Sequence, residues 1–432
     1  MDHFDRLEQT AARDGTATML RELGESLRDR RRWHALFDLR LLEARVALGL
    51  PAGGDSADLP EKVRDALDER SLAACREAGW PLLEEGQVAA GWMYLRAGAD
   101  PAAVAARLAA LAGEPLAAMA TAADPGDEAD DSGRERSAAL LQEIVHVALW
   151  EGVDPALGIE IVLRTQGTCN AITAYEQGVS RLPARRQQQA IAVLVRHLHH
   201  EVARSLRGDL EARSAAVPPA GDADPLPPLL TALAAAGGPD DPAIHVDVSH
   251  LQSVLRIARV SDDPDTIHAA WELACYACRL PADVVYPGEP PFEEVGRASR
   301  LFFGARLGHD VGEAVGFFRR AARTERQEES GTHACDTLVL LLDRLGRPHE
   351  ALSALLERPA EGQFPSPLQA SGALPSIVDL AARADAWEDL LAACRARGDE
   401  ITFAAAVAAR DHQSRYQGLA HSTQVPPPPL PR

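Results

Sequence analysis

The clearest structural signal in the sequence is the segment Leu345-Gly346-Arg347-Pro348-His349-Glu350-Ala351-Leu352. It has the order of a helix end, a glycine turn and a Glu-Ala pair that opens a second, amphipathic helix. Residues 307–315, LGHDVGEAV, repeat this order, and their Ala314 lies 37 positions before Ala351. A further 39 positions lead to Leu390. Regular spacing of this kind predicts repeated helix pairs.

The rest of the sequence has the same helical character. Hydrophobic residues occupy 46% of the 432 positions, but aromatic residues only 5%. Ala, Leu and Arg are strong helix formers, whereas strands favour β-branched and aromatic residues. Apolar residues recur every three or four positions, as in Leu20, Leu23 and Leu27, and the best period-2 alternation covers only residues 245–248. We expect an all-α protein with helices of about 10 to 18 residues.

The helix-pair pattern resembles the tetratricopeptide family, whose repeats stack into an α-solenoid of antiparallel helix pairs. Residues 83–92, LEEGQVAAGW, together with Pro101 are similar to an N-terminal copy. The repeat spacing exceeds the roughly 34 residues of that family, and no copy has its whole signature. Residues 91–96, 168–173 and 286–288 also resemble a group of uncharacterised bacterial proteins, and no function follows from that resemblance.

Composition divides the chain into six expected segments. Acidic, proline-rich and glycine-rich stretches predict linkers, and a run of prolines predicts an extended tail. The segments are N-terminal helical repeats over 1–120, an acidic linker over 121–135, a central helical region over 136–213, a proline-rich linker over 214–228, C-terminal tetratricopeptide-like repeats over 229–411, and a disordered proline-rich tail over 412–432.

The charge balance argues against a nucleic-acid partner. Lys and Arg number 44 against 64 Asp and Glu, a formal net charge of −20 that repels phosphate backbones. The basic cluster at residues 28–32 spreads around a helix and is typical of a solvated corner. Lys62 is the only lysine and follows Glu61, which excludes a P-loop.

Other global features favour a cytoplasmic location. The N-terminus lacks the basic and apolar order of a signal peptide, and the strongest apolar run, residues 338–342, is too short to span a bilayer. Six scattered cysteines do not form a disulfide framework. We therefore expect no membrane partner and a reducing compartment.

The most interesting constellation is His245, Asp247 and His250, at the start of an expected helix. Two imidazoles and a carboxylate could ligate a divalent metal that keeps open positions. Alternatively, Ser249 and Gln252 form a capping box, which explains the polar residues without a metal. Both interpretations remain open, and the second needs no cofactor.

Four further motifs have simple structural explanations. His197, His200 and Glu201 share one helical face, and His199 points elsewhere. The pair Cys275 and Cys278 lacks a second pair for zinc and is expected to be buried. Cys169 could be a reactive thiolate at a helix start, although Thr168 is an ordinary cap there. Residues 262–265 predict a helix start with Asp263 as its cap and Pro264 at its first position.

Two functional hypotheses follow from these observations. The first is an interaction protein, whose stacked helix pairs present a concave groove to a protein or peptide. The second is an uncharacterised all-α enzyme or small-ligand protein, whose site lies around His245, Asp247 and His250 with Tyr286 or the helix of His197 nearby. We favour the first, because no complete catalytic motif is present.

Overall fold

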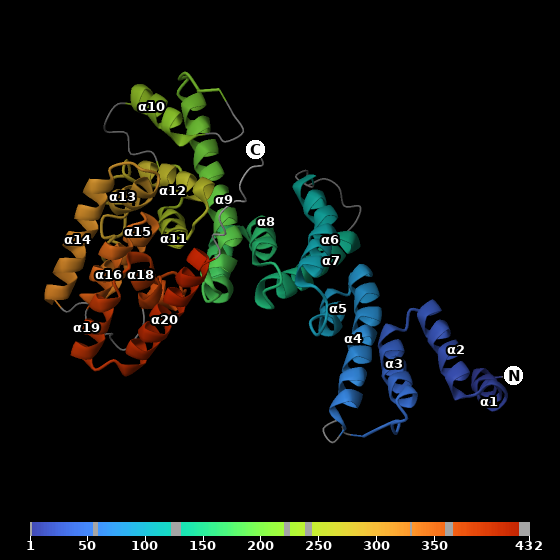
Figure 1. Cartoon of the computed structure of the whole chain (residues 1–432). Coiled ribbons are helices and arrows are strands. Elements are labelled where there is room, and N and C mark those ends of the chain that lie inside the picture. The colour runs from blue at the N-terminus through green and yellow to red at the C-terminus, as the bar shows by residue number, and fades with distance from the viewer. Residues whose placement is uncertain are drawn as a thin grey trace, which may run out of the picture. The chain divides into compact units, whose positions relative to one another are not determined.

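The computed structural model describes residues 2–54, 59–121, 131–219, 225–237, 244–328, 331–358 and 366–422. All regular secondary structure in these ranges is helical, which confirms the predicted all-α class (Figure 1). The chain forms two compact units, residues 1–171 and 172–432. The boundary falls inside the segment expected to be the central helical region.

The first unit is a succession of helices in which consecutive elements pack together, as α1 does on α2, α3 on α4 and α4 on α5. Its apolar core joins α5, α6 and α7 with the end of α4. The elements are α1 His3–Asp14, α2 Thr16–Asp29, α3 Trp33–Ala47, α4 Glu61–Glu84, α5 Val88–Leu95, α6 Pro101–Thr121, α7 Asp131–Val145, η2 His146–Trp150 and most of α8 Pro155–Ala174.

Glycines bring α4 and α5 into close contact. A Cβ atom on Gly91 would lie 2.8 Å from the backbone nitrogen of Leu83, and one on Gly79 would lie 2.7 Å from Cγ of Leu95. Such distances are too short for carbon atoms, so the crossing requires residues without side chains. The segment identified as an N-terminal repeat copy therefore does contain a tight helix pair.

The second unit is built around the long helix α9, on which α10, α11 and α12 pack. Buried positions along α9 recur at helical spacing, as in Ile191, Leu194 and Leu198. The elements are η3 Tyr175–Val179, α9 Ala184–Ala212, α10 Leu226–Gly237, α11 Val248–Ala258, α12 Pro264–Ala277, α13 Val295–Arg306, α14 Val311–Glu328, α15 His333–Arg344, α16 Pro348–Leu356, α17 Pro367–Ala370, α18 Ile377–Ala384, α19 Trp387–Arg397 and α20 Glu400–Ser422.

The segments that suggested repeats are helix–turn–helix elements. The turn glycines Gly308 and Gly346 have φ of +89° and +68°, which glycine adopts without strain. Ala314 and Ala351 are fully buried in α14 and α16, and Leu390 is fully buried in α19. α15 packs on both α14 and α16. Local turn chemistry and burial thus agree with the pattern in the sequence.

Several expected boundaries and lengths were wrong. Five helices in the described ranges exceed 18 residues, the longest being α9 with 29. Residues 131–135 of the expected acidic linker belong to α7, while 122–130 lie outside the described residues. Pro227 and Pro228 open α10, because proline fits the first turn of a helix. α20 continues to Ser422, so the expected tail from residue 412 began too early, and 423–432 lie outside the described part.

One described helix is long and apolar enough, by length and composition, to cross a membrane: residues Pro101–Met119 of α6. Its positions Val104, Leu108, Ala112 and Leu116 recur every four residues and are buried in the core of the first unit. These positions form the core-facing stripe of the helix, and 22% of the apolar segment is buried.

Candidate functional site

Of the three residues proposed as metal ligands, His245 and Asp247 have separate side-chain partners, and the His250 backbone N–H donates to Asp247 at 3.4 Å. Nε2 of His245 lies 2.9 Å from Oδ2 of Asp209 on α9, and the His245 backbone N–H donates to the Tyr276 hydroxyl at 2.8 Å. The Asp247 carboxylate instead accepts from the Ser249 N–H and hydroxyl at 2.8 and 2.6 Å. No group of three or more His, Cys, Asp or Glu residues within the described ranges is placed to hold a metal.

The helix start is therefore capped differently from the expected capping box. Asp247 is the N-cap of α11, and the bonds from Ser249 hold its pKa below the ordinary value. Gln252 does not reach back, because its amide donates to the Tyr286 carbonyl at 2.5 Å. The capping box was wrong, and local spacing could not show it, since Tyr286 is 34 positions away. The metal hypothesis stays a prediction for elemental analysis.

A buried pair on the other side of α9 was missed. His199, on the face opposite to the expected cluster, has Nε2 2.6 Å from Oε2 of Glu272 on α12. Glu272 also accepts from the Leu226 N–H at the start of α10, at 3.1 Å. The cluster expected on the other face is more open: His197 lies 3.8 Å from Glu201, and partial burial lowers the pKa of His197.

The cysteine and aspartate motifs are structural, with one correction. Asp263 caps α12 by accepting from the Thr266 N–H at 2.9 Å, as predicted. Cys275 is half-buried, and burial raises its pKa to about 11. Cys278 is exposed, contrary to expectation, because it is the C-cap of α12. Cys169 is exposed and follows a kink at Gly167, where φ is +83°.

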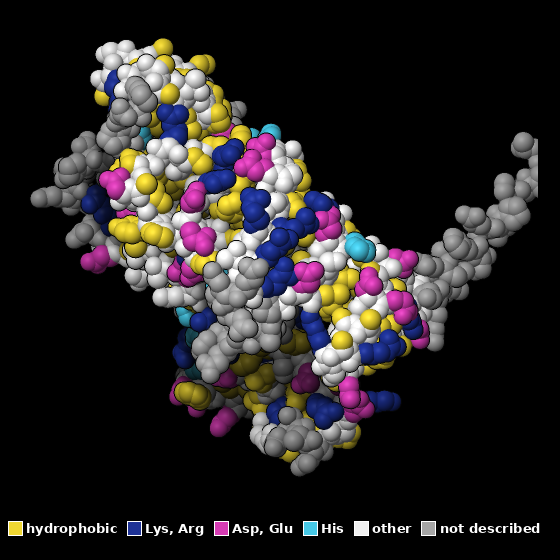
Figure 2. Space-filling view, turned by 90° about the vertical axis from the view of Figure 1, so that its left-hand side faces the viewer, with side chains coloured by type: hydrophobic (Ala, Val, Ile, Leu, Met, Phe, Trp, Pro, Cys, Tyr) yellow, Lys and Arg dark blue, Asp and Glu magenta, His cyan; other side chains and the backbone are white. Residues whose placement is uncertain are grey.

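An Arg-rich surface lies on the side of the second unit that carries α14. Figure 2 views this side and shows Lys and Arg side chains crossing it. The exposed arginines of α14 include Arg319, Arg320 and Arg323. Arg319 lies 2.6 Å from Glu350, and Arg326 pairs with Glu357. Exposed pairs of this kind are typical of a solvated surface and contribute little to stability.

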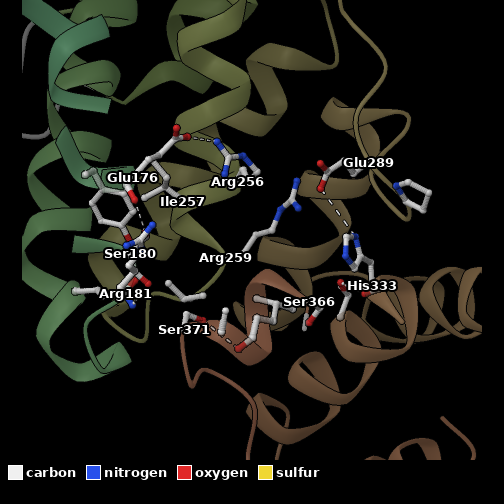
Figure 3. A pocket seen from close by; sticks show the side chains of 17 residues that line it. Glu176, Ser180, Arg181, Arg256, Ile257, Arg259, Glu289, His333, Ser366 and Ser371 are labelled. Carbon is white, nitrogen blue, oxygen red and sulfur yellow. Dashed lines mark hydrogen bonds and ion pairs between the residues drawn. The ribbon is translucent and has the colours of Figure 1, made fainter. Parts of the chain in front are cut away.

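The better candidate is a cavity of about 440 Å³ in the second unit (Figure 3). Side chains from η3, the start of α9, the end of α11, the loop before α13, α15 and α17 surround it. They include both apolar and charged groups, as ligand pockets usually do. The lining residues are Tyr175, Glu176, Ser180, Arg181, Gln187, Arg256, Ile257, Arg259, Val260, Glu289, Pro290, His333, Thr337, Ser366, Leu368, Ala370 and Ser371.

Hydrogen bonds hold one wall of the cavity rigid. The Tyr175 hydroxyl donates to the Gln187 side chain at 2.7 Å, and burial raises the pKa of Tyr175. The Gln187 amide in turn donates to the carbonyls of Ser180 and Leu182 at 3.1 and 2.6 Å. A buried network with satisfied donors fixes a single geometry. This wall is therefore preformed.

The charged groups of the cavity are unequally matched. Arg256 pairs with Glu176, and Glu289 lies 3.9 Å from His333. Arg259 has its guanidinium carbon 3.3 Å from the centre of the buried Phe292 ring, and its Nε is buried without a hydrogen-bond partner. Burial lowers the pKa of Arg259 to about 9, so the side chain is still charged at neutral pH.

The hydroxyl groups of the cavity are already engaged. Ser180 donates to the Glu176 carbonyl at 2.6 Å and Ser371 to the Leu368 carbonyl at 3.0 Å. Ser366 accepts from the Gln369 N–H at 3.2 Å. Ser180 and Ser371 thus donate to main-chain carbonyls, whereas Ser366 is also hydrogen-bonded to the Asp336 carboxylate.

Comparison with protein-family models, curated proteins and solved structures finds no match. The cavity was also not predicted from the sequence. Its lining residues extend from Tyr175 to Ser371, and no local spacing connects them. One signal in the sequence could have pointed to the cavity. Arg259 directly follows the apolar positions of α11, where a charged residue is uncommon.

Proposed function

We propose that the protein is a cytoplasmic helical-repeat scaffold that binds a protein or peptide partner. Its consecutive helix pairs would stack as in a tetratricopeptide-like α-solenoid, which presents side chains of several pairs to one ligand. Tight turns at Gly308 and Gly346 and the buried positions of Ala314 and Ala351 support this arrangement. We expect neither a nucleic-acid nor a membrane partner, and no cofactor.

The observation that carries the proposal is the mixed cavity of the second unit. Apolar side chains such as Ile257, Val260 and Leu368 lie beside polar ones on preformed helices. A volume of about 440 Å³ accommodates one or two residues of an extended peptide. The occupied serine hydroxyls favour binding over group transfer. The partner segment is therefore a peptide that inserts side chains or its chain end here.

A displayed library of random peptides, selected on the purified full chain, tests this function. Ala370→Trp places a bulky ring at the exposed edge of the cavity, and Ala235→Trp on α10 is a matched exposed control. Peptides selected by the wild type should lose at least about tenfold in affinity, or 1.4 kcal/mol, only with Ala370→Trp. Selection of no peptide, or equal binding to both variants, would contradict the proposal.

A further inference from the structure

Arg259 is a half-buried cation in the wall of the cavity, and its Nε atom is enclosed by the protein. No carboxylate of the described residues lies within ion-pair distance of its guanidinium, and its Nε lacks a hydrogen-bond partner. Figure 3 shows the side chain pointing into the cavity between Arg256 and Glu289. Buried charges in proteins are normally paired, because desolvation without a partner is costly. A cation that faces a cavity without an ion-pair partner is available to bind an anion.

The surrounding charges leave a small positive surplus. The cavity contains three arginines and two glutamates, so its formal charge is +1 when His333 is neutral. Arg256 is already paired with Glu176. Glu289 lies 3.9 Å from His333; it attracts Arg259 through space but forms no ion pair with it. This surplus stands out in a chain with a net charge of −20.

We propose that Arg259 binds a single carboxylate group of the peptide partner. One face of its guanidinium is covered by Phe292, and the N–H edges are the donors that remain for a ligand. Ile257, Val260 and Leu368 line the same cavity and would contact the aliphatic carbons next to the carboxylate. The source of the carboxylate, a peptide, rests on the function proposed above.

A carboxylate fits this cavity better than a phosphate. A monoanion matches the surplus of one positive charge, whereas a phosphate group carries close to two negative charges at pH 7. Glu176 and Glu289 line the cavity too and would repel the second charge. Free inorganic phosphate is therefore the discriminating probe.

The carboxylate site can be tested without knowing the partner. Butyrate, inorganic phosphate and chloride are compared at equal ionic strength by thermal unfolding of the full chain. Butyrate, an aliphatic monoanion, should raise Tm by about 2 °C relative to chloride, and phosphate by less. Arg259→Met should abolish the butyrate shift, while Arg320→Met, on the exposed face of α14, should retain it. If Arg259→Met does not fold, Ala370→Trp serves instead. It blocks the cavity and should also abolish the shift.

Equal shifts in wild type and Arg259→Met, or a larger shift with phosphate, would overturn the carboxylate site. The peptides selected above separate this from the function itself. Peptides that lose binding with Ala370→Trp but not with Arg259→Met would leave the scaffold function intact and refute the carboxylate site. A butyrate shift that depends on Arg259, without any selected peptide, would support the site and refute a peptide as its source.

Discussion

Ionisable groups have different surroundings before and after α11. Before it, His245 faces Asp209 of α9 at 2.9 Å, and between α9 and α12 His199 faces Glu272 at 2.6 Å. At the C-terminal end of α11, Arg259 faces an aromatic ring and a cavity. The first arrangement joins helices, since each partner sits on a different element. The second leaves the charge of Arg259 available. The histidine–carboxylate pairs thus stabilise the fold, whereas Arg259 is available to a ligand.

The largest expected effect comes from breaking a buried pair. Glu272→Ala removes the partner of His199 and of the Leu226 N–H, and should reduce the free energy of unfolding by about 3–5 kcal/mol. Glu201→Ala, at the more exposed His197 pair, should cost less than about 1 kcal/mol. Urea unfolding followed by circular dichroism measures both. Equal losses would remove the distinction between the two pairs.

A smaller effect is expected where no charge is involved. Ala351 is fully buried where α16 packs on α15, so Ala351→Leu should overpack this contact and cost about 1–3 kcal/mol. Ala396→Leu on the exposed side of α19 is the control and should be nearly neutral. A wild-type melting temperature for Ala351→Leu would argue against the alignment of the repeats.

The cap of α11 should contribute less and depend on pH. Asp247→Ala should cost about 1 kcal/mol at pH 7, because it removes the acceptor for the helix-start N–H groups. The pKa of Asp247 is held below its ordinary 3.8, so the ionised form favours folding above that pH. The contribution is lost as pH falls through the lowered pKa. A difference between wild type and variant that grows on acidification would contradict this assignment.

Removal of the Arg259 charge at the cavity should cost almost no free energy of unfolding. Arg259→Met removes a charge that has no acidic partner among the described residues, so stability should stay equal or rise slightly. The pKa of Arg259 is lowered to about 9 in the folded chain. Above that pH the unfolded chain therefore binds more protons than the folded chain does. The Arg259 contribution therefore favours folding more as pH rises from about 9. A loss as large as that of Glu272→Ala would make Arg259 a structural residue.

If the His245 segment binds no metal, adding a chelator should leave the stability unchanged. Elemental analysis of protein purified without chelator should find no stoichiometric metal, because His245 and Asp247 are engaged with Asp209 and Ser249. Near-stoichiometric zinc, manganese or iron that disappears in the double variant His245→Ala/His250→Ala would restore the hypothesis.

Features governed by neighbouring residues could be predicted from the sequence. Helical spacing and propensity indicated an all-α chain, and the turn at Gly346 and the cap at Asp263 follow rules that act within a few positions. Where two local rules competed, as between Asp247 and Ser249, the prediction failed. The start of α10 at Leu226 and the end of α20 at Ser422 were misjudged because composition alone does not place a helix end.

The tertiary structure alone decided which groups meet. His199 and Glu272 are 73 positions apart, and the cavity side chains extend over almost 200. Their encounter depends on how α9, α11, α12 and α15 pack, which is a property of the whole core and leaves no local spacing in the sequence. The same packing placed the guanidinium of Arg259 against Phe292 at the cavity, without an ion-pair partner among the described residues.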